Sequence, residues 1–253
     1  MGQAILRGAI KAEVVEARQV LVVDTDKQRR SEIEALGCVA TEDATESLTA
    51  EQIMLAVKPQ VFVAVASSIA PLTESKIVIS IMAGLSSKVL RAALGENARI
   101  VRVMPNTPCS VGAGMTAIAF GVGAKPGDEA LAESLFKSLG EIAIVDESLM
   151  HAVTAVSGSG PAYVFLLAEQ MQKAAIDLGI DQATAKLLAY QTIFGAGKML
   201  CESSMNACDL RDAVTSPGGT TQAAIEVMMK RDLPMIINHA IHAAHERGVE
   251  LDQ

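Results

Sequence analysis

The sequence has few aromatic residues and no excess of positive charge. Only 3% of its 253 residues are aromatic, with no Trp, two Tyr and five Phe. So few rings argue against a base-stacking platform for single-stranded nucleic acid. The formal net charge of −8 argues against nucleic acid or an anionic membrane as the main partner. Because aromatic residues are so few, the core must be aliphatic, filled by Ala, Val, Ile, Leu and the 12 Met.

Long apolar runs and paired cysteines are also missing. No apolar run reaches the roughly 18–20 residues that a membrane-spanning helix needs. The first eight residues lack the basic-then-apolar order of a signal peptide. The four cysteines, Cys38, Cys109, Cys201 and Cys208, are scattered and form no CxxC pair. We therefore expect reduced thiols in a cytoplasmic globular protein, with no membrane or nucleic-acid partner.

The chain changes character near residue 146. Before it, apolar β runs at 19–23, 53–57, 76–81, 99–104, 115–119 and 141–145 alternate with helical stretches near 3–12, 27–36, 60–70 and 86–94. This alternation predicts an α/β domain with a mostly parallel sheet over residues 1–147. Beyond it, helical periodicity at 148–156, 161–178, 181–203, 220–230 and 233–247 predicts an all-helical domain over 148–253.

The helical half carries more apolar positions than one five-helix cluster can bury. The excess lies over residues 161–178 and 183–201. Obligate interfaces resemble a domain core cut in half, so this half predicts a homo-oligomer, with a well-packed monomer as the alternative.

Several features of the first half point to a dinucleotide. Gly2 opens the first helix and fits the third glycine of a G-x-G-x-x-G turn, and Asp24 lies about 20 residues on, where an acidic residue binds ribose. An ordinary N-terminal helix is the alternative. The stretches Ala56-Val57-Lys58-Pro59 and Met104-Pro105-Asn106-Thr107-Pro108 each end a strand. Ligands of open α/β sheets bind there, although plain strand-ending turns have the same composition.

A third cluster, residues 210–221, precedes an amphipathic helix. Its Pro217-Gly218-Gly219 run lets the backbone approach a ligand closely, and the helix start offers unpaired N–H groups. Ser216, Thr220 and Thr221 add hydroxyls. This pattern favours a receptor for a small carboxylate or phosphate, with simple N-capping by Thr220 as the alternative.

Taken together, these stretches resemble pyrroline-5-carboxylate reductase. The similar segments are residues 1–5, 56–59, 104–108, 112–116, 156–163 and 210–221, in order over nearly the whole chain. The resemblance implies a Rossmann-like NAD(P)H domain and a helical domain that forms a dimer or an assembly of dimers. It implies the last step of proline biosynthesis, the reduction of L-1-pyrroline-5-carboxylate to L-proline.

The resemblance also implies roles for individual residues. Ser216 and the amides of Gly218, Gly219 and Thr220 would hold the substrate carboxylate, and the Thr221 hydroxyl would bond the ring nitrogen, which makes Thr221 and Ser216 the catalytic pair. Ser157 and Gly158 would lie beside the substrate. The residues expected at the cofactor are Gly2, Asp24, Asp43, Ala56, Val57, Lys58, Pro59, Asn106 and Pro108. No metal is expected, because a protonated imine is already electrophilic and the cofactor carries the chemistry.

Two departures from the family pattern bear on the cofactor. The family has a strand and a glycine turn ahead of Met1-Gly2, so we expect an incomplete pyrophosphate cradle and a sheet truncated at its N-terminus, from a late start codon or a fragment. Asp24 suits the ribose diol of NADH, as does Asp43 where the family commonly has Asn. Lys27, Arg29 and Arg30 suit the 2′-phosphate of NADPH instead, so either cofactor stays open.

The sequence leaves other functions open beside this one. An inactive fragment that retains only oligomerisation is one alternative, and a related NAD(P)-dependent imine or hydroxyacid oxidoreductase is another. A hydroxyacid dehydrogenase places a Lys base on the helix after its Gly-Ser-Gly turn, where this chain reads Tyr163-Val164-Phe165-Leu166. His239, His242 and His245 recur every third residue and rotate around a helix, which favours structural histidines over metal ligands.

Overall fold

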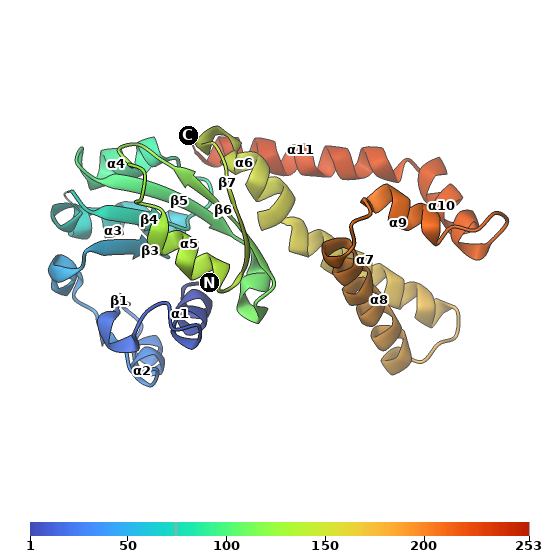
Figure 1. Cartoon of the computed structure of the whole chain (residues 1–253), viewed down its shortest axis with the longest axis horizontal. Coiled ribbons are helices and arrows are strands. Elements are labelled where there is room, and N and C mark those ends of the chain that lie inside the picture. The colour runs from blue at the N-terminus through green and yellow to red at the C-terminus, as the bar shows by residue number, and fades with distance from the viewer. Residues whose placement is uncertain (74, 253) are drawn as a thin grey trace. The chain divides into compact units, whose positions relative to one another are not determined.

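The computed structural model describes residues 1–73 and 75–252 (Figure 1). Packing divides the chain into two compact units. The first, here the sheet unit, comprises Met1–Ser159 and the C-terminal residues from Ala244, and the second, here the helical unit, comprises Gly160–Ala243. The domain boundary expected after residue 147 stays a prediction; the compact units place residues 148–159 and the C-terminal end with the sheet.

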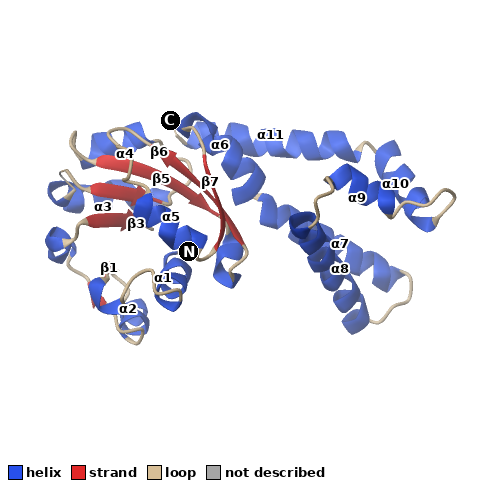
Figure 2. Ribbon diagram, viewed as in Figure 1, coloured by secondary structure: helices blue, strands red, loops and turns tan. Residues whose placement is uncertain are grey.

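Within its described residues, the sheet unit contains a two-stranded and a five-stranded sheet, and Figure 2 shows the larger one in red. The strands are β1 (Leu21–Val23), β2 (Val39–Thr41), β3 (Gln52–Leu55), β4 (Ile77–Ser80), β5 (Arg99–Pro105), β6 (Gly114–Phe120) and β7 (Gly140–Ile144). Strands β1 and β2 pair in parallel, and the other five follow the order β3-β4-β5-β6-β7, with only β5 and β6 antiparallel. The predicted mostly parallel α/β fold is confirmed. Within the described residues, no strand joins β1 to β3.

Helices cover the five-stranded sheet on both faces because its strands are apolar on both. Val78 and Ile100 point into a cluster with α3 (Phe62–Ile69) and α4 (Ser87–Leu94). Their neighbours Ile79 and Val101 point into a second cluster with α1 (Gly2–Lys11) and α5 (Ala130–Lys137). Successive strand residues face opposite sides, so two apolar layers follow directly from the continuous apolar runs.

The remaining helices of the sheet unit differ in part from the prediction. Helix α2 (Lys27–Glu34) is capped by the Asp26 carboxylate. The helix expected over 148–156 is instead a short α6 (Met150–Val153) continued by a π-helical turn, Thr154–Gly158. The sequence does not predict helix α5 or strand β2. Helix α5 lies between the β runs at 115–119 and 141–145, which the apolar pattern predicts as consecutive strands.

The helical unit consists of helices alone. They are α7 (Gly160–Asp177), α8 (Gln182–Glu202), α9 (Ala207–Ala213), α10 (Thr220–Lys230) and the start of α11 (Leu233–Leu251), which ends in the sheet unit. Helices α7 and α8 pack on each other, yet large apolar side chains such as Phe165, Leu187 and Phe194 are 63–67% exposed. A single chain therefore leaves much apolar surface uncovered, as the excess of apolar positions predicts. No helix in the described part of the chain is long and apolar enough to cross a membrane.

Candidate active site

The ends of β1, β3 and β5 carry the residues predicted to hold the cofactor. Asp24 directly follows β1, Ala56 directly follows β3, and Asn106 directly follows β5. Gly2 is the first residue of α1, and a Cβ built on it would lie 3.2 Å from the Cβ of Ala56. The start of α1 therefore packs closely against the end of β3, where a Rossmann-like unit brings backbone N–H groups to a pyrophosphate.

The other residues expected at the cofactor lie in the turns beyond these strands. Val57 packs against the α3 and α4 side of the core, and Lys58 precedes a 3₁₀ turn, Pro59–Val61. Pro108 belongs to the 3₁₀ turn Thr107–Val111 after β5. Asp43 follows β2, and its Oδ1 accepts the N–H and the hydroxyl of Thr45, both at 2.8 Å. These bonds, the backbone one first, hold the pKa of the Asp43 carboxyl below its usual value.

Asn106 joins two predicted site regions that lie 51 residues apart in sequence. Its Nδ2 donates to the backbone oxygen of Ser157 at 3.3 Å and to the Ser157 hydroxyl at 3.4 Å. Its Oδ1 accepts the Met115 N–H at 3.0 Å. Ser157 and Gly158 end the π-helical turn, and a Cβ on Gly158 would run into the Met104 side chain. The structure thus brings the β5 end and the Ser157-Gly158 segment together.

The loop before α10 is shaped by its two glycines. Gly218 has φ +73°, which favours glycine, and Gly219 is the N-cap of α10, without a side-chain cap. A Cβ on Gly219 would lie 2.5 Å from the Ser216 hydroxyl, so a larger residue there would displace that group. Thr220 is the first helical residue, so the alternative in which it caps the helix does not hold in this structure.

Some backbone N–H groups of this loop already have an acceptor, and others precede the first hydrogen bond of α10. The Gly219 N–H donates to the Ser216 carbonyl at 3.0 Å, and the Gly218 N–H donates to the Gln222 side-chain oxygen at 2.6 Å. The first bond within α10 is donated by the Ala223 N–H to the Gly219 carbonyl. The N–H groups of Thr220, Thr221 and Gln222 precede that bond and face out from the helix start, where an anion is stabilised.

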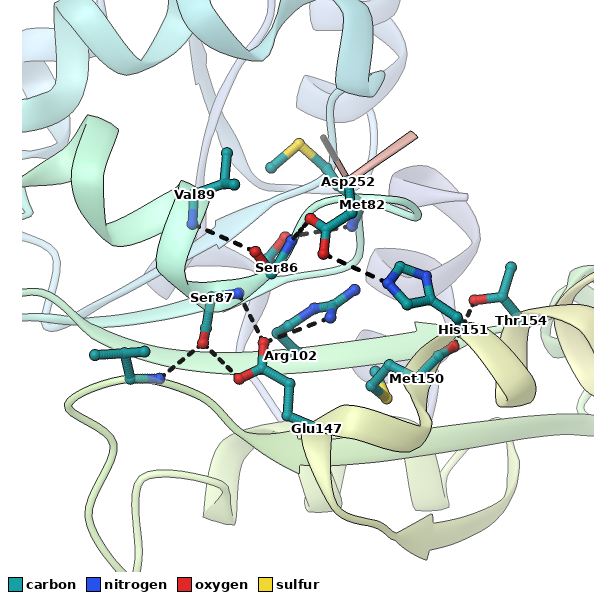
Figure 3. A network of polar contacts seen from close by, with 12 residues as sticks. Met82, Ser86, Ser87, Val89, Arg102, Glu147, Met150, His151, Thr154 and Asp252 are labelled. Carbon is teal, nitrogen blue, oxygen red and sulfur yellow. Dashed lines mark hydrogen bonds and ion pairs between the residues drawn. The ribbon is translucent and has the colours of Figure 1, made fainter. Parts of the chain in front are cut away.

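A buried polar network supports β5 and was missed in the sequence (Figure 3). Arg102, in the middle of β5, is only 4% exposed and donates to Glu147 at 3.4 Å. Glu147 also accepts the Ser87 N–H at 2.7 Å and the Ser87 hydroxyl at 2.5 Å. The Ser87 hydroxyl in turn accepts the Val122 N–H. The only available signal is a charged residue in the middle of a mostly apolar strand, and it does not reveal the partner.

The C-terminal end of α11 is tied to the same region (Figure 3). Asp252 accepts the Ser86 N–H and lies 3.4 Å from His151 Nε2. The His151 ring meets the His245 ring edge-on at 6.4 Å between centroids. His245 therefore packs within the sheet unit. Within the described residues, no group of three His, Cys, Asp or Glu side chains lies together as a metal site.

Two family models match the chain in turn. Residues 147–251 match the model described as pyrroline-5-carboxylate reductase dimerisation. Residues 1–84 match the model described as NADP oxidoreductase, coenzyme F420-dependent.

Full-length relatives and solved structures are also similar to this chain. Pyrroline-5-carboxylate reductase of Haemophilus influenzae is 40% identical over 256 residues, which cover 100% of this chain and 94% of the relative. The Synechocystis enzyme is 38% identical over 253 residues, 99% of this chain and 94% of the relative. The structure of the Coxiella burnetii reductase superposes with a TM-score of 0.92 at 35% identity, covering 100% and 95% of the two chains. The Plasmodium falciparum reductase, solved with NADP bound, gives 0.89 at 30% identity, with the same coverage.

Proposed function

The chain belongs to the pyrroline-5-carboxylate reductase family, and we propose that it reduces L-1-pyrroline-5-carboxylate to L-proline by hydride transfer from NAD(P)H. The observation that carries this is similarity over the full chain at 38–40% identity, covering 94% of each relative. The same coverage disfavours an assembly-only fragment, because both the strand-end residues and the 216–221 loop are present and folded.

The loop before α10 is the proposed carboxylate site. The N–H groups that precede the first α10 bond, with the Ser216 hydroxyl beside Gly219, supply donors for an anionic group. The expected contribution of the Gly218 amide requires the Gln222 side chain to leave it, because Gln222 accepts that N–H here. Thr220 and Thr221 offer their amides without such a rearrangement.

Thr221 is the proposed partner of the ring nitrogen. NAD(P)H, when bound, supplies the hydride to the imine carbon, and the nitrogen keeps its proton as it becomes an amine. The Thr221 hydroxyl, in the first turn of α10, holds that nitrogen and so fixes the ring relative to the carboxylate. Holding the reacting atoms in one geometry is the main contribution a protein can make to such a transfer.

The strand ends of the sheet unit fit the cofactor. The close approach of Gly2 to Ala56 leaves little room for a side chain at the start of α1, as the last glycine of a dinucleotide turn requires. In this proposal Asp24 and Asp43 would serve the ribose end of such a site, and Ala56, Val57, Lys58 and Pro59, which continue from β3, would belong to it as well. Asn106, through its bonds to Ser157, holds the segment expected beside the substrate. Pro108 stiffens the turn that follows Asn106.

We further propose that the helical unit forms the homo-oligomer and that the protein is cytoplasmic. The exposed apolar side chains of α7 and α8 support self-association, since a second copy would remove them from water. All four cysteines are free thiols, which fits a reducing compartment.

Turnover with the natural substrate tests the proposed function. The purified chain, given pyrroline-5-carboxylate, should oxidise NADH or NADPH with proline formed in equal amount. Thr221→Val should lower turnover at least tenfold with nearly unchanged cofactor affinity, because it removes a hydroxyl and keeps the shape. Thr221→Ser restores the hydroxyl and is the matched control. Full turnover by Thr221→Val would contradict the role given to Thr221.

A further inference from the structure

The end of β1 distinguishes the two nicotinamide cofactors. We propose that this chain prefers NADH to NADPH, because the Asp24 carboxylate accepts the hydroxyls of the adenosine ribose and opposes a 2′-phosphate. The inference rests on the proposed function and names its cofactor.

Asp24 is held in one position at the end of β1. Its N–H donates to the Thr41 carbonyl at 3.0 Å, which aligns the ends of β1 and β2. Its Oδ1 accepts the Asp26 N–H at 2.9 Å. The side chain is 28% exposed, so it is reachable from solvent while its orientation is fixed. A carboxylate in this position is the acceptor that a ribose diol requires in a dinucleotide site.

The arginines that suit a 2′-phosphate are already engaged with acceptors. Arg30 donates from Nη1 to the Asp24 carbonyl at 2.7 Å, and its Nη2 lies 3.2 Å from Glu42. The Arg30 side chain is only 16% exposed. Binding a phosphate with both arms of the guanidinium fork would require both contacts to break.

Arg29 is shared between two carboxylates. Its Nη1 lies 3.7 Å from Asp24 Oδ2, and its Nε lies 3.6 Å from Asp26 Oδ2. Asp26 is itself fixed, because its Oδ1 caps α2 by accepting the N–H groups of Gln28 and Arg29. The positive charge of Arg29 therefore already neutralises these two carboxylates. It adds no net positive charge that could bind a 2′-phosphate dianion.

The charge balance around the ends of β1 and β2 also favours NADH. The carboxylates of Asp24, Asp26, Glu42, Asp43 and Glu46 outnumber the cations of Lys27, Arg29 and Arg30. A 2′-phosphate would add further negative charge to a site that is already net negative. The neutral diol carries no such cost and gains acceptors from Asp24.

Binding of cofactor fragments tests this inference without turnover. We would titrate the full chain with ADP-ribose and with its 2′-phosphorylated form by calorimetry, and repeat it with NADH and NADPH by nicotinamide fluorescence. We expect at least tenfold tighter binding of the unphosphorylated member of each pair, which corresponds to about 1.4 kcal/mol. Asp24→Ser should reduce this ratio of affinities about tenfold. It should weaken the binding of the unphosphorylated ligand and tighten the binding of the 2′-phosphorylated one. Asp24→Ser with Glu42→Gln should tighten the binding of 2′-phosphorylated ligands further, because the Nη2 of Arg30 then loses its carboxylate partner while its Nη1 keeps the backbone carbonyl of residue 24.

The matched control is Asp181→Ser. It makes the same substitution at the N-cap of α8, where Ser also caps, and should leave the ratio unchanged. Equal or tighter binding of the phosphorylated ligands by the unaltered chain would overturn the preference while leaving the reductase intact. A ratio that Asp24→Ser does not change, in a variant with an unchanged melting temperature, would overturn the role of Asp24. Failure to bind any of the four ligands would overturn both the inference and the proposed function.

Discussion

Glu147→Ala should destabilise the sheet unit far more than an ordinary loss of a surface carboxylate. Glu147 accepts two bonds from Ser87 and faces Arg102 at 3.4 Å. Burial lowers the pKa of the Arg102 guanidinium, and Glu147 opposes that effect most, followed by Asp252. Removing Glu147 leaves a buried cation with one remaining carboxylate in its surroundings. Breaking a buried pair on one side costs about 3–5 kcal/mol. Because Asp252 remains and Glu147 is 25% exposed, we expect a loss of about 3 kcal/mol, the lower end of that range.

The assay is urea unfolding followed by far-ultraviolet circular dichroism at one fixed protein concentration. Glu147→Gln is the graded variant: it keeps an acceptor for Ser87 and loses the charge, so its effect should be smaller. Glu250→Ala is the control, because Glu250 pairs with Arg247 on the exposed face of α11 and such pairs contribute little. The reasoning would be refuted if Glu147→Ala shifted the transition no more than Glu250→Ala. It would also be refuted if Glu147→Gln were the more damaging variant.

Two further predictions concern the helical unit. Gln222→Ala should lower the KM for pyrroline-5-carboxylate severalfold with little change in NAD(P)H affinity, because it frees the Gly218 N–H; a raised KM would contradict this, and Gln182→Ala on α8 is the control. Bonds from Thr184, the largest cause, hold the pKa of the Asp181 carboxyl below its usual value of roughly 4. The charged cap therefore stabilises α8 above that pH and loses this contribution as pH falls through the lowered pKa. Asp181→Asn caps without titrating, so the melting-temperature advantage of the unaltered chain over it should shrink between pH 7 and pH 3; a constant or growing advantage would contradict the assignment.

The elements predicted well are those that local sequence determines. Strands β4 and β5 fall within two residues of the predicted runs, because continuous apolar residues fit a strand covered on both faces. Strand β2 has three residues and no comparable run, so only its pairing with β1 defines it. The π-helical turn could not be predicted either, because it too depends on a contact with a distant part of the chain. Its Gly158 lies against Met104, a contact across more than 50 residues of chain that no local pattern encodes.

The site shows the same division between local and distant information. Asn106 and Ser157 belong to separate sequence motifs, and only the fold shows that the Asn106 side chain bonds Ser157. Arg102 could be noticed as an odd charge in an apolar strand, but Glu147 lies 45 residues on and gave no sign of being its partner. Chemistry that depends on a motif is therefore readable in sequence, whereas the groups that hold the motif in place are not.

The loop before α10 illustrates what the fold adds to a motif that the sequence had already found. Thr220 was an open choice between a helix cap and part of an anion receptor. In the structure Gly219 takes the cap position and has no side chain to satisfy the first N–H groups. A Ser or Thr there would have bonded one of them, at a gain over Gly of roughly a few tenths of a kcal/mol. The chain forgoes that stabilisation and places the hydroxyls of Thr220 and Thr221 just inside the helix instead. An uncapped start costs stability unless a ligand supplies the missing acceptors, so binding a carboxylate should stabilise α10 itself.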